Sequence, residues 1–232
     1  MYRIAGLNVS VLNRCTLFEN RAEEYRLDRS VEADIVIDSG PADIARVQSL
    51  YSHLTLDECV YICTGDKFSV NLLDHGGFRL HASAVVLDGR AYLFSANSGV
   101  GKSTHTALWC QYFGPERTFI LNDDMPSVKW EGDSFYAWGT PWSGTSPLNR
   151  NMGVPLQAIA FLERSQTDRI ERLDNAHSVA SLMMATRKGL GPVRLEKLMV
   201  LLDRLLNTVP VYKLGCTPTI SAVQTAFAAM AG

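Results

Sequence analysis

Ala96-Asn97-Ser98-Gly99-Val100-Gly101-Lys102-Ser103-Thr104 is the stretch of this sequence that decides the fold. It follows an apolar run typical of a strand, residues 91–94, and it opens a predicted amphipathic helix, Lys102 to Tyr112. A glycine-rich turn between a strand and a helix is the setting of a phosphate-binding loop. The glycines let backbone N–H groups surround an anion, and the helix N-terminus adds a favourable dipole. A turn that merely caps the helix is the alternative, and we favour the phosphate-binding loop.

The side chains of this loop have distinct expected roles. The Lys102 ammonium is expected to contact the β- and γ-phosphates of ATP, and the Ser103 hydroxyl is expected to bind Mg²⁺. Ala96 stands where the strict pattern has glycine. The predicted nucleotide-binding residues are Asn97, Ser98, Gly99, Val100, Gly101, Lys102, Ser103 and Thr104.

A second signal is a pair of acids, Asp123 and Asp124, at the end of the apolar run 119–121. The pair begins 21 residues after Lys102, with one predicted helix between. Adjacent side chains on a strand point in opposite directions, so the two carboxylates have different tasks unless the strand ends there. We assign Asp123 as the base that accepts a hydroxyl proton and Asp124 as the metal-holding acid. The reverse assignment fits the sequence almost equally well, and an acidic turn is the structural alternative.

Residues 1–78 are predicted to form a small β-rich region, and Asp74 to Gly77 is a predicted turn at its end. β-branched and aromatic residues dominate its predicted strands, and Gly, Asp, Asn and Ser interrupt them. These strands are Tyr2 to Leu12, Asp34 to Asp38, Cys59 to Thr64 and Phe68 to Leu73; the one predicted helix is Ala42 to Tyr51.

Residues 79–232 are predicted to form an α/β core. Two strands, residues 80–88 and 90–96, flank Asp88-Gly89, which is a strong hairpin signal. Further strands are expected at Thr118 to Leu121, Ala158 to Glu163 and Val209 to Leu214, with a hairpin at Val128 to Trp138 and a loop from Gly139 to Asn151. Helices are expected at Ala176 to Arg187, at Pro192 to Asn207 and after Thr217-Pro218.

Composition excludes several classes of protein. The 232 residues carry 22 Lys and Arg against 24 Asp and Glu, so no overall positive field attracts a nucleic acid. No apolar run reaches the roughly 20 residues that span a bilayer, and the first residues lack the apolar core of a signal peptide. We therefore expect a cytoplasmic protein with no membrane partner. Its five cysteines, an odd number, are expected to be reduced thiols.

The loop followed soon by an Asp-Asp pair resembles the HPr kinase and phosphoenolpyruvate carboxykinase superfamily. Leu80-His81-Ala82-Ser83-Ala84 is similar to the His-containing strand that precedes the loop in HPr kinase, and Gly139-Thr140-Pro141-Trp142-Ser143-Gly144 is similar to a loop of small HPr kinase-like proteins. The long glycine-rich signature of true HPr kinase/phosphorylases is missing. The chain is also too short for the substrate domain of a carboxykinase.

This resemblance implies a P-loop core with a mixed sheet after the small β-rich region. It implies a kinase that uses Mg²⁺ and ATP to phosphorylate a hydroxyl, with serine as the expected acceptor, on a protein, peptide or small molecule. It also implies homo-oligomers. A nucleotide-binding sensor or accessory protein of a peptide-modification system is the second hypothesis. The resemblance places His81 beside the acids, where it orients an Asp or contacts a phosphate; a histidine at the edge of the core is the alternative.

Arg150 is a third catalytic candidate, because it follows the flexible stretch Ser143 to Asn149. A guanidinium on a mobile loop suits the charge of a transferring phosphoryl group. We expect residues 143–151 to be a mobile loop that closes over the phosphates; a solvated loop arginine is the alternative. His105 is expected to be a surface or packing residue. Trp138, Pro141 and Trp142 are expected to pack beneath the loop rather than against a ligand.

Overall fold

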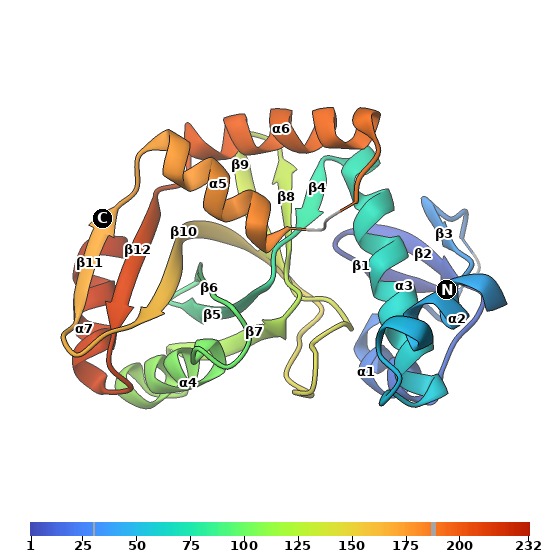
Figure 1. Cartoon of the computed structure of the whole chain (residues 1–232), viewed down its shortest axis with the longest axis horizontal. Coiled ribbons are helices and arrows are strands. Elements are labelled where there is room, and N and C mark those ends of the chain that lie inside the picture. Colours follow the sequence, from blue (N-terminus) through green and yellow to red (C-terminus); the bar gives the residue numbers. More distant parts are fainter. Residues whose placement is uncertain (30, 187–188) are drawn as a thin grey trace.

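The computed structural model describes residues 1–29, 31–186 and 189–232. The chain folds as a mixed α/β protein with a large curled sheet and a small three-stranded sheet near the N-terminus. Helix α3 (Leu56–Leu72) lies between the small sheet and the rest of the molecule (Figure 1). The strand-turn-helix unit that the sequence predicts is part of the large sheet.

In the described residues the large sheet has nine strands, and its main path runs β4-β8-β9-β10-β6-β5-β7. The longest strand is β10 (Gly153–Arg164), which pairs antiparallel with β9 and parallel with both β6 and β12. The sheet is therefore mixed, as predicted. Its other strands are β4 (Gly77–Arg79), β5 (Ala82–Leu87), β6 (Arg90–Ser95), β7 (Thr118–Asp124), β8 (Ser127–Glu131), β9 (Ser134–Trp138), β11 (Arg169–Arg172) and β12 (Val211–Cys216).

The predicted hairpin around Asp88-Gly89 is confirmed. β5 and β6 pair antiparallel from Ala82 opposite Ser95 to Leu87 opposite Arg90. Asp88 and Gly89 both have positive φ, at 49° and 75°, as a two-residue type I′ turn requires. β6 then delivers the chain directly into the glycine-rich loop.

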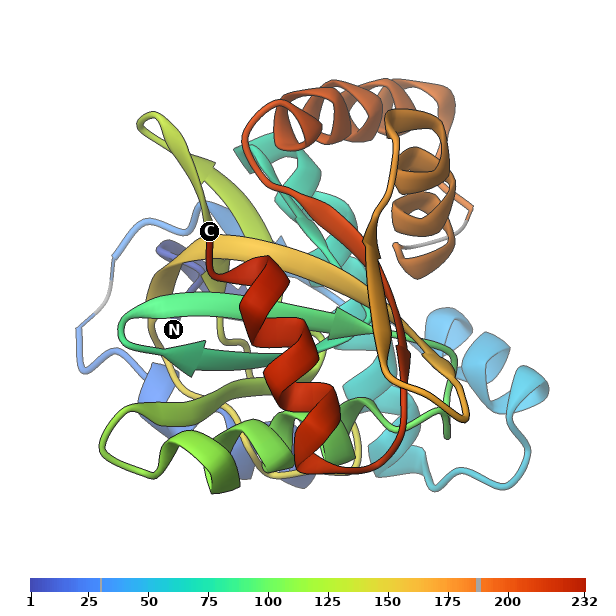
Figure 2. The same ribbon diagram turned by 90° about the vertical axis from the view of Figure 1, so that its left-hand side faces the viewer.

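Helices cover both faces of the large sheet (Figure 2). α4 (Lys102–Phe113) and α7 (Ile220–Met230) pack on one face, where Trp109 and Val223 share a core with Phe94. α5 (Asn175–Ala185) and α6 (Pro192–Leu206) cover the other face, where Leu182 and Leu202 share a second core with other strand residues. The loop between β6 and α4 therefore emerges at one edge of a packed three-layer core.

The N-terminal unit differs from its prediction. Strands β1 (Tyr2–Ile4), β2 (Leu7–Val11) and β3 (Ile35–Ile37) are short, and α2 (Pro41–Leu50) confirms the predicted helix. The predictions of strands at Cys59 to Thr64 and at Phe68 to Leu73 are wrong, because both segments belong to α3, apart from Leu73 at its C-cap. The unit also contains α1 (Thr16–Arg21) and the short 3₁₀ helix η1 (Glu23–Tyr25), which were not predicted.

Local capping explains the helix in place of two strands. Thr55 accepts a hydrogen bond from the Glu58 backbone N–H, and the Glu58 carboxylate accepts one from the Thr55 backbone N–H. This reciprocal capping box satisfies two backbone donors and starts α3. Cys59 and Cys63 lie one turn apart on the helix and are both buried as free thiols. α3 is helical although it contains β-branched and aromatic residues, because it is buried on several sides and this burial outweighs their strand propensity.

Several other elements differ from prediction: the single predicted strand Tyr2 to Leu12 is the pair β1 and β2, β4 was not predicted, and β10 begins at Gly153 rather than Ala158. β7 extends through Asp124 rather than ending at Leu121, and β11 was not predicted. α5 ends at Ala185, and the predicted end at Arg187 lies outside the described residues. The predicted turn before residue 78 contains the 3₁₀ helix η2 (Leu73–His75) and Gly76, which has φ of 73°. The division of the chain at residue 78 stays a prediction; β4 spans it.

Within the described parts of the chain, no helix combines the length and apolar character that crossing a membrane requires.

Candidate functional site

The glycine-rich loop connects β6 to α4, as the sequence predicts. α4 begins at Lys102, and Gly101 precedes it with φ of 126°. Gly99 also has positive φ, at 77°. Side chains rarely adopt either conformation, so these two positions require glycine. The turn leaves the first backbone N–H groups of α4 without partners inside the helix, which is the property that an anion-binding loop uses.

Lys102 faces the acid pair. Its ammonium donates a hydrogen bond to the Ala96 carbonyl oxygen at 3.0 Å, so the side chain folds back over the loop. Burial lowers the pKa of Lys102 from its usual value, and the nearby carboxylates of Asp124 and Asp123 oppose that change. The structure thus brings the predicted phosphate-contacting lysine and both predicted acids into one site.

His81 joins this site through the neighbouring strand. β7 pairs with β5 so that Asp124 lies opposite Ala82, one residue after His81. The His81 Nε2 atom lies 3.2 Å from Asp124 Oδ1, and both side chains are partly exposed. The His81 backbone is held at both polar groups, because its N–H donates to Ala185 O and its carbonyl accepts from Ser95 Oγ. His81 therefore lies beside Asp124.

The two acids have different surroundings. Asp123 lies opposite Ser83 on β5, and its Oδ1 atom is buried without a hydrogen-bond partner in the described residues. Asp124, in contrast, has His81 as a neighbour and contacts the loop at Gly144, where an added Cβ would lie 2.9 Å from the Asp124 side chain. Within the described residues, Asp123 is therefore the acid whose buried oxygen could still accept a cation or a hydrogen-bond donor.

Asn122 was not assigned a role from the sequence. It is fully buried, and its side-chain oxygen accepts hydrogen bonds from the backbone N–H groups of Asp124 and Met125. Its amide donates to the Thr140 carbonyl at 2.8 Å. Asn122 thus fixes the backbone of the acid pair and ties it to the loop that follows β9. The signal in the sequence was an amide directly before two acids at a strand end.

Residues 143–151 do not form a free lid in this structure. Asn149 bridges to Asn122, the Asp123 N–H donates to Leu148 O, and the Arg150 N–H donates to Leu121 O. Residues 148–150 therefore lie antiparallel beside β7, joined to it by an isolated bridge. These backbone bonds argue against the expectation of a mobile loop, because each would have to break for the segment to open.

Arg150 does not reach the acids. Its guanidinium carbon lies 4.4 Å from the centre of the Phe119 ring, in a cation–π contact. Phe119 is four residues before Asp123 on β7, roughly 13 Å along an extended strand. The structure brings His81, Lys102, Asp123 and Asp124 together and leaves Arg150 outside that group.

The N-terminal unit contacts the part of this loop that precedes the pairing with β7, residues 141–146. Arg21 on α1 donates through Nη1 to Ser143 Oγ at 2.6 Å and also to the Ser146 carbonyl. The Tyr61 hydroxyl on α3 accepts from the Ser143 N–H and donates to Pro141 O, both at 2.8 Å. Trp142 is buried and stacks on Phe68 at 4.9 Å between ring centres, so its predicted packing role is confirmed. Sequence analysis did not anticipate this contact between distant segments.

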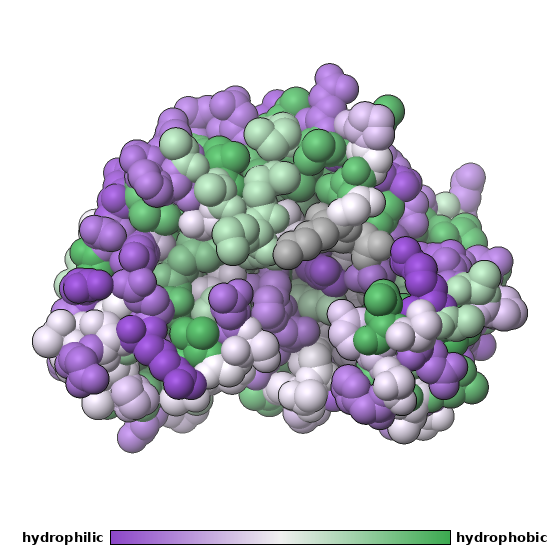
Figure 3. Space-filling model, viewed as in Figure 1, coloured by the Kyte–Doolittle hydropathy of each residue, from purple (hydrophilic) through white to green (hydrophobic). Residues whose placement is uncertain are grey.

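Two cavities flank the glycine-rich loop. A smaller one, of about 180 Å³, is lined by His81 and Ser95 before the loop, by Ala96 and Asn97 in it, and by Ser181 and Met184 of α5. Figure 3 shows hydrophobic side chains gathered over α5 on this face. A larger one, of about 490 Å³, lies on the other side of the loop, against α4 and the ends of β10 and β12. The loop residues therefore separate two spaces of different size.

His105 lines the larger cavity. The side chain is buried, so His105 is the packing residue rather than the surface residue of the prediction. Its Nε2 atom accepts a hydrogen bond from Trp109 Nε1 at 3.1 Å. Burial lowers the pKa of His105 to about 4, so the ring is neutral near pH 7. Its Nδ1 atom has no hydrogen-bond partner in the described residues.

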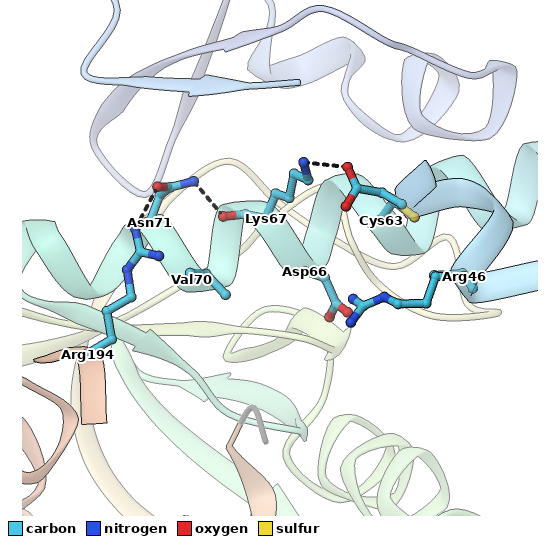
Figure 4. Close-up of a pocket in the computed structure, with 9 residues that line it drawn as sticks. Arg46, Cys63, Asp66, Lys67, Val70, Asn71 and Arg194 are labelled. Carbon is cyan, nitrogen blue, oxygen red and sulfur yellow. Dashed lines mark hydrogen bonds and ion pairs between the residues drawn. The ribbon is translucent and has the colours of Figure 1, made fainter. Parts of the chain in front are cut away.

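A third cavity, of about 310 Å³, lies away from the loop between α2, α3 and the start of α6. Its charged groups are largely paired with one another: Lys67 lies 2.6 Å from Asp43, and Arg194 donates to Asn71 at 3.2 Å (Figure 4). Arg194 also lies 3.1 Å from Asp74, so two of the three cations that line the cavity already have a carboxylate partner.

Two side chains of the site offer oxygen donors of the kind that Mg²⁺ takes. No group of three or more His, Cys, Asp or Glu side chains gathers as a metal cluster in the parts of the chain that are described. Magnesium is commonly bound by only one or two protein oxygens together with phosphates and water. The orphaned Asp123 oxygen fits this donor set, and so does the exposed Ser103 hydroxyl at the start of α4.

Comparisons with known proteins give one family match. The model of the family described as SynChlorMet cassette protein ScmC matches residues 67–219. No curated protein matches the chain. Among solved structures, the Hpr(Ser) kinase/phosphatase from Coxiella burnetii aligns with a TM-score of 0.37 and 15% sequence identity, over 66% of this chain and 99% of that one. Because the family model covers well over half of the 232 residues, the protein belongs to the ScmC family of SynChlorMet cassette proteins.

Proposed function

We propose that this protein is a Mg²⁺- and ATP-dependent kinase that phosphorylates a hydroxyl, with serine on a protein, peptide or small molecule as the expected acceptor. One observation carries the proposal: Lys102 at the start of α4 lies near two adjacent carboxylates, one 3.2 Å from a histidine nitrogen and the other with a buried oxygen that lacks a partner in the described residues. Phosphoryl transfer needs this combination of a phosphate cation, a metal-holding acid and a base.

The surroundings of the two acids favour one division of labour over the other. Asp123 and Ser103 would hold Mg²⁺, which supplies positive charge to the phosphate oxygens when bound. Asp124, oriented by His81, would accept the proton of the acceptor hydroxyl. This reverses the assignment made from the sequence. The reason is that the buried Asp123 Oδ1 atom has no partner in the described residues, whereas Asp124 has the His81 Nε2 atom 3.2 Å away.

The smaller cavity supports a place for the acceptor. His81 lines it together with Ser95 and the first loop residues. A hydroxyl bound there approaches the loop from the side of His81 and Asp124, where the base lies. A volume of about 180 Å³ suits a side chain such as serine better than a whole folded domain.

The family description supports a second candidate. A cassette protein can act beside other proteins, so we also propose an accessory role in a peptide-modification system, in which nucleotide is bound without transfer of phosphate. The two functions differ in what the acid pair does. A sensor needs Lys102 and the loop, whereas a kinase also needs a base beside an acceptor cavity.

Nucleotide turnover with candidate acceptors separates the two. Wild-type protein is mixed with Mg²⁺, radiolabelled ATP and serine, a serine-containing peptide library or a carrier protein, and labelled acceptor is measured. We expect label transfer only with an acceptor, and we expect Lys102→Ala to lose both transfer and the rise in melting temperature that Mg-ATP causes. Lys213→Ala, at a partly exposed position on β12, is the control.

Each proposal fails on a different result. Nucleotide binding without transfer to any acceptor would leave only the accessory role. The absence of any thermal shift or calorimetric heat with nucleoside di- or triphosphates would overturn both.

A further inference from the structure

We propose that phosphoryl transfer goes to a serine that has a bulky apolar residue beside it in a peptide, and that Met184 on α5 recognises this neighbour. The inference rests on the proposed function and deepens it, because it takes the serine hydroxyl to enter the smaller cavity beside the glycine-rich loop. In the transfer step the serine Oγ bonds to the γ-phosphorus of ATP, its proton passes to Asp124, and ADP leaves. The inference adds a substrate class and a specificity-determining residue.

The lining of the smaller cavity argues against free serine as the acceptor. Among the described residues that form it, His81 is the one ionisable side chain. The ammonium of free serine would therefore leave water without meeting a carboxylate of this lining, which costs free energy. A serine within a peptide has a neutral amide in that place, and an amide costs much less to bury.

Apolar side chains form much of the rest of this lining. They are Phe161 and Leu162 of β10 and Met184 and Ala185 of the last turn of α5. Met184 is 72% exposed, the largest exposed fraction among the large hydrophobic side chains of the described residues. A side chain that lines a cavity and is also this exposed lies at the mouth of the cavity. Met184 is therefore placed to contact whatever adjoins the group inside.

The apolar surface continues from Met184 along α5. Ala176, Ala180 and Met184 are spaced four residues apart, so they lie on one face of the helix, and all three are exposed. Figure 3 shows the hydrophobic side chains gathered over α5. A peptide whose serine side chain enters the cavity continues at its mouth, against this face. The cavity therefore gives the surface one occupant, the acceptor peptide, and the apolar face selects the residues beside the serine.

The kind of side chain at position 184 sets how selective this contact is. Methionine is unbranched and polarizable, so it adapts its shape to leucine, isoleucine or phenylalanine. Each of these loses contact with water when it packs on Met184, whereas glycine gains little and a charged residue would be desolvated. The expected substrates are therefore peptides with any bulky apolar residue next to the serine.

Steady-state transfer to a set of blocked heptapeptides tests the inference. Each peptide has one central serine in a glycine background, flanked on both sides by leucine, by glycine or by lysine, and free serine is a further acceptor. We expect wild type to use the leucine peptide with a kcat/KM about 10-fold or more above that of every other acceptor, because leucine on Met184 removes apolar surface from water.

Met184→Glu should change this preference. The substitution replaces the apolar contact with a negative charge, so we expect the preference for the leucine peptide over the glycine peptide to be lost. The lysine peptide should gain roughly 3-fold in kcat/KM relative to the glycine peptide, the usual effect of an exposed ion pair.

Val200→Glu is the matched control for this variant. Val200 on α6 is 58% exposed and lines a different cavity, against Gly76, so this protein should keep the leucine preference of wild type. The rise in melting temperature with Mg-ATP, measured for both variants, verifies that the glycine-rich loop is intact.

The outcomes distinguish this inference from the function on which it rests. If wild type uses the glycine peptide or free serine as well as the leucine peptide, or if Met184→Glu keeps the leucine preference, the recognition of an apolar neighbour is wrong and the kinase stands. If wild type binds Mg-ATP and labels none of these acceptors, the kinase is overturned together with this inference.

Discussion

At the scale of single residues, the consecutive side chains Asn122, Asp123 and Asp124 have three different environments. Asn122 is buried and hydrogen-bonds the backbone on both sides of a strand end. Asp123 has a buried oxygen without a partner, and Asp124 contacts His81. The alternation of side chains along β7 separates the two acids, and the neighbouring strand β5 supplies the histidine to one of them.

The acid pair gives the first prediction at this scale. Asp123→Asn should bind ATP but need far more Mg²⁺ for transfer, because one anionic metal ligand is lost. Asp124→Asn should keep its Mg²⁺ requirement and lose transfer by 10²-fold or more, within the usual effect of removing a general base. Initial rates measured over a series of Mg²⁺ concentrations discriminate between the two effects. Asp133→Asn, in the exposed turn between β8 and β9, is the matched control. If Asp124→Asn needed more Mg²⁺ and Asp123→Asn lost transfer, the assignment made from the sequence would be restored. If both variants were fully active, the two acids would have no catalytic role and would only form an acidic turn.

His81 gives the second residue-scale prediction. If it orients Asp124, His81→Ala should lower the transfer rate by roughly 10-fold or more and leave the affinity for ATP nearly unchanged. His81→Asn should recover part of the rate if its shorter side chain still donates to Asp124. A loss of ATP affinity with an unchanged rate would instead indicate a phosphate contact. Steady-state kinetics with separate measurement of ATP affinity by calorimetry makes the distinction.

At the scale of elements, α3 is central to how the N-terminal unit joins the core. Its Phe68 and Tyr61 share a cluster with strand residues of the small sheet and with Trp142 of the loop. Thr64 Oγ1 accepts a hydrogen bond from Trp142 Nε1 at 3.1 Å. Close approach of the indole to the helix depends on Gly65, where an added Cβ would lie 2.8 Å from Trp142 Cδ1.

Gly65→Ala should therefore lower the stability of the protein, although helix propensity alone predicts that it raises it. Alanine favours a helix interior over glycine by about 1 kcal/mol. The clash with the buried indole ring should outweigh this, because overpacking a well-packed site costs about 1–3 kcal/mol. We expect a net decrease in the free energy of unfolding, measured by urea denaturation. Gly40→Ala, where nothing lies within 4 Å of the added Cβ, should change it by less than about 1 kcal/mol. A Gly65→Ala protein more stable than wild type would show that α3 and Trp142 are free to move apart.

At the scale of the whole molecule, the N-terminal unit holds the loop that contacts the acid pair. Arg21 binds Ser143 and Ser146, and Asn151 donates to Glu24 O at 3.1 Å. The same loop contacts Asp124 at Gly144. A segment more than 100 residues away in the sequence therefore sets the position of one wall of the site.

Arg21→Ala tests this long-range support. We expect faster amide hydrogen exchange in residues 143–149, because a charge-assisted anchor is lost. Transfer should fall several-fold, whereas binding of ATP should be nearly unchanged because the glycine-rich loop is not contacted by Arg21. Arg3→Ala, an exposed position on β1, should alter neither. Unchanged exchange and unchanged transfer in Arg21→Ala would show that the loop is held by its pairing with β7 alone.

The sequence by itself determined the local features of this protein. The glycine-rich loop between β6 and α4, the Asp88-Gly89 hairpin, and the helices α2, α4, α6 and α7 follow from short-range patterns, because turn glycines, capping residues and periodicity act within a few residues. The placement of Lys102 near an acidic strand end was also predictable, because the carboxyl ends of β6 and β7 lie at the same edge of the sheet.

Only the tertiary structure decided the rest. Burial made one helix of Cys59 to Leu72, where propensity indicated strands. Pairing of residues 148–150 with β7 replaced an expected mobile lid, and it placed Arg150 on Phe119 rather than beside the acids. The different surroundings of Asp123 and Asp124, and the support of the loop by Arg21, depend on which distant segments meet. Such contacts are set by packing and long-range hydrogen bonds, and no local pattern records them.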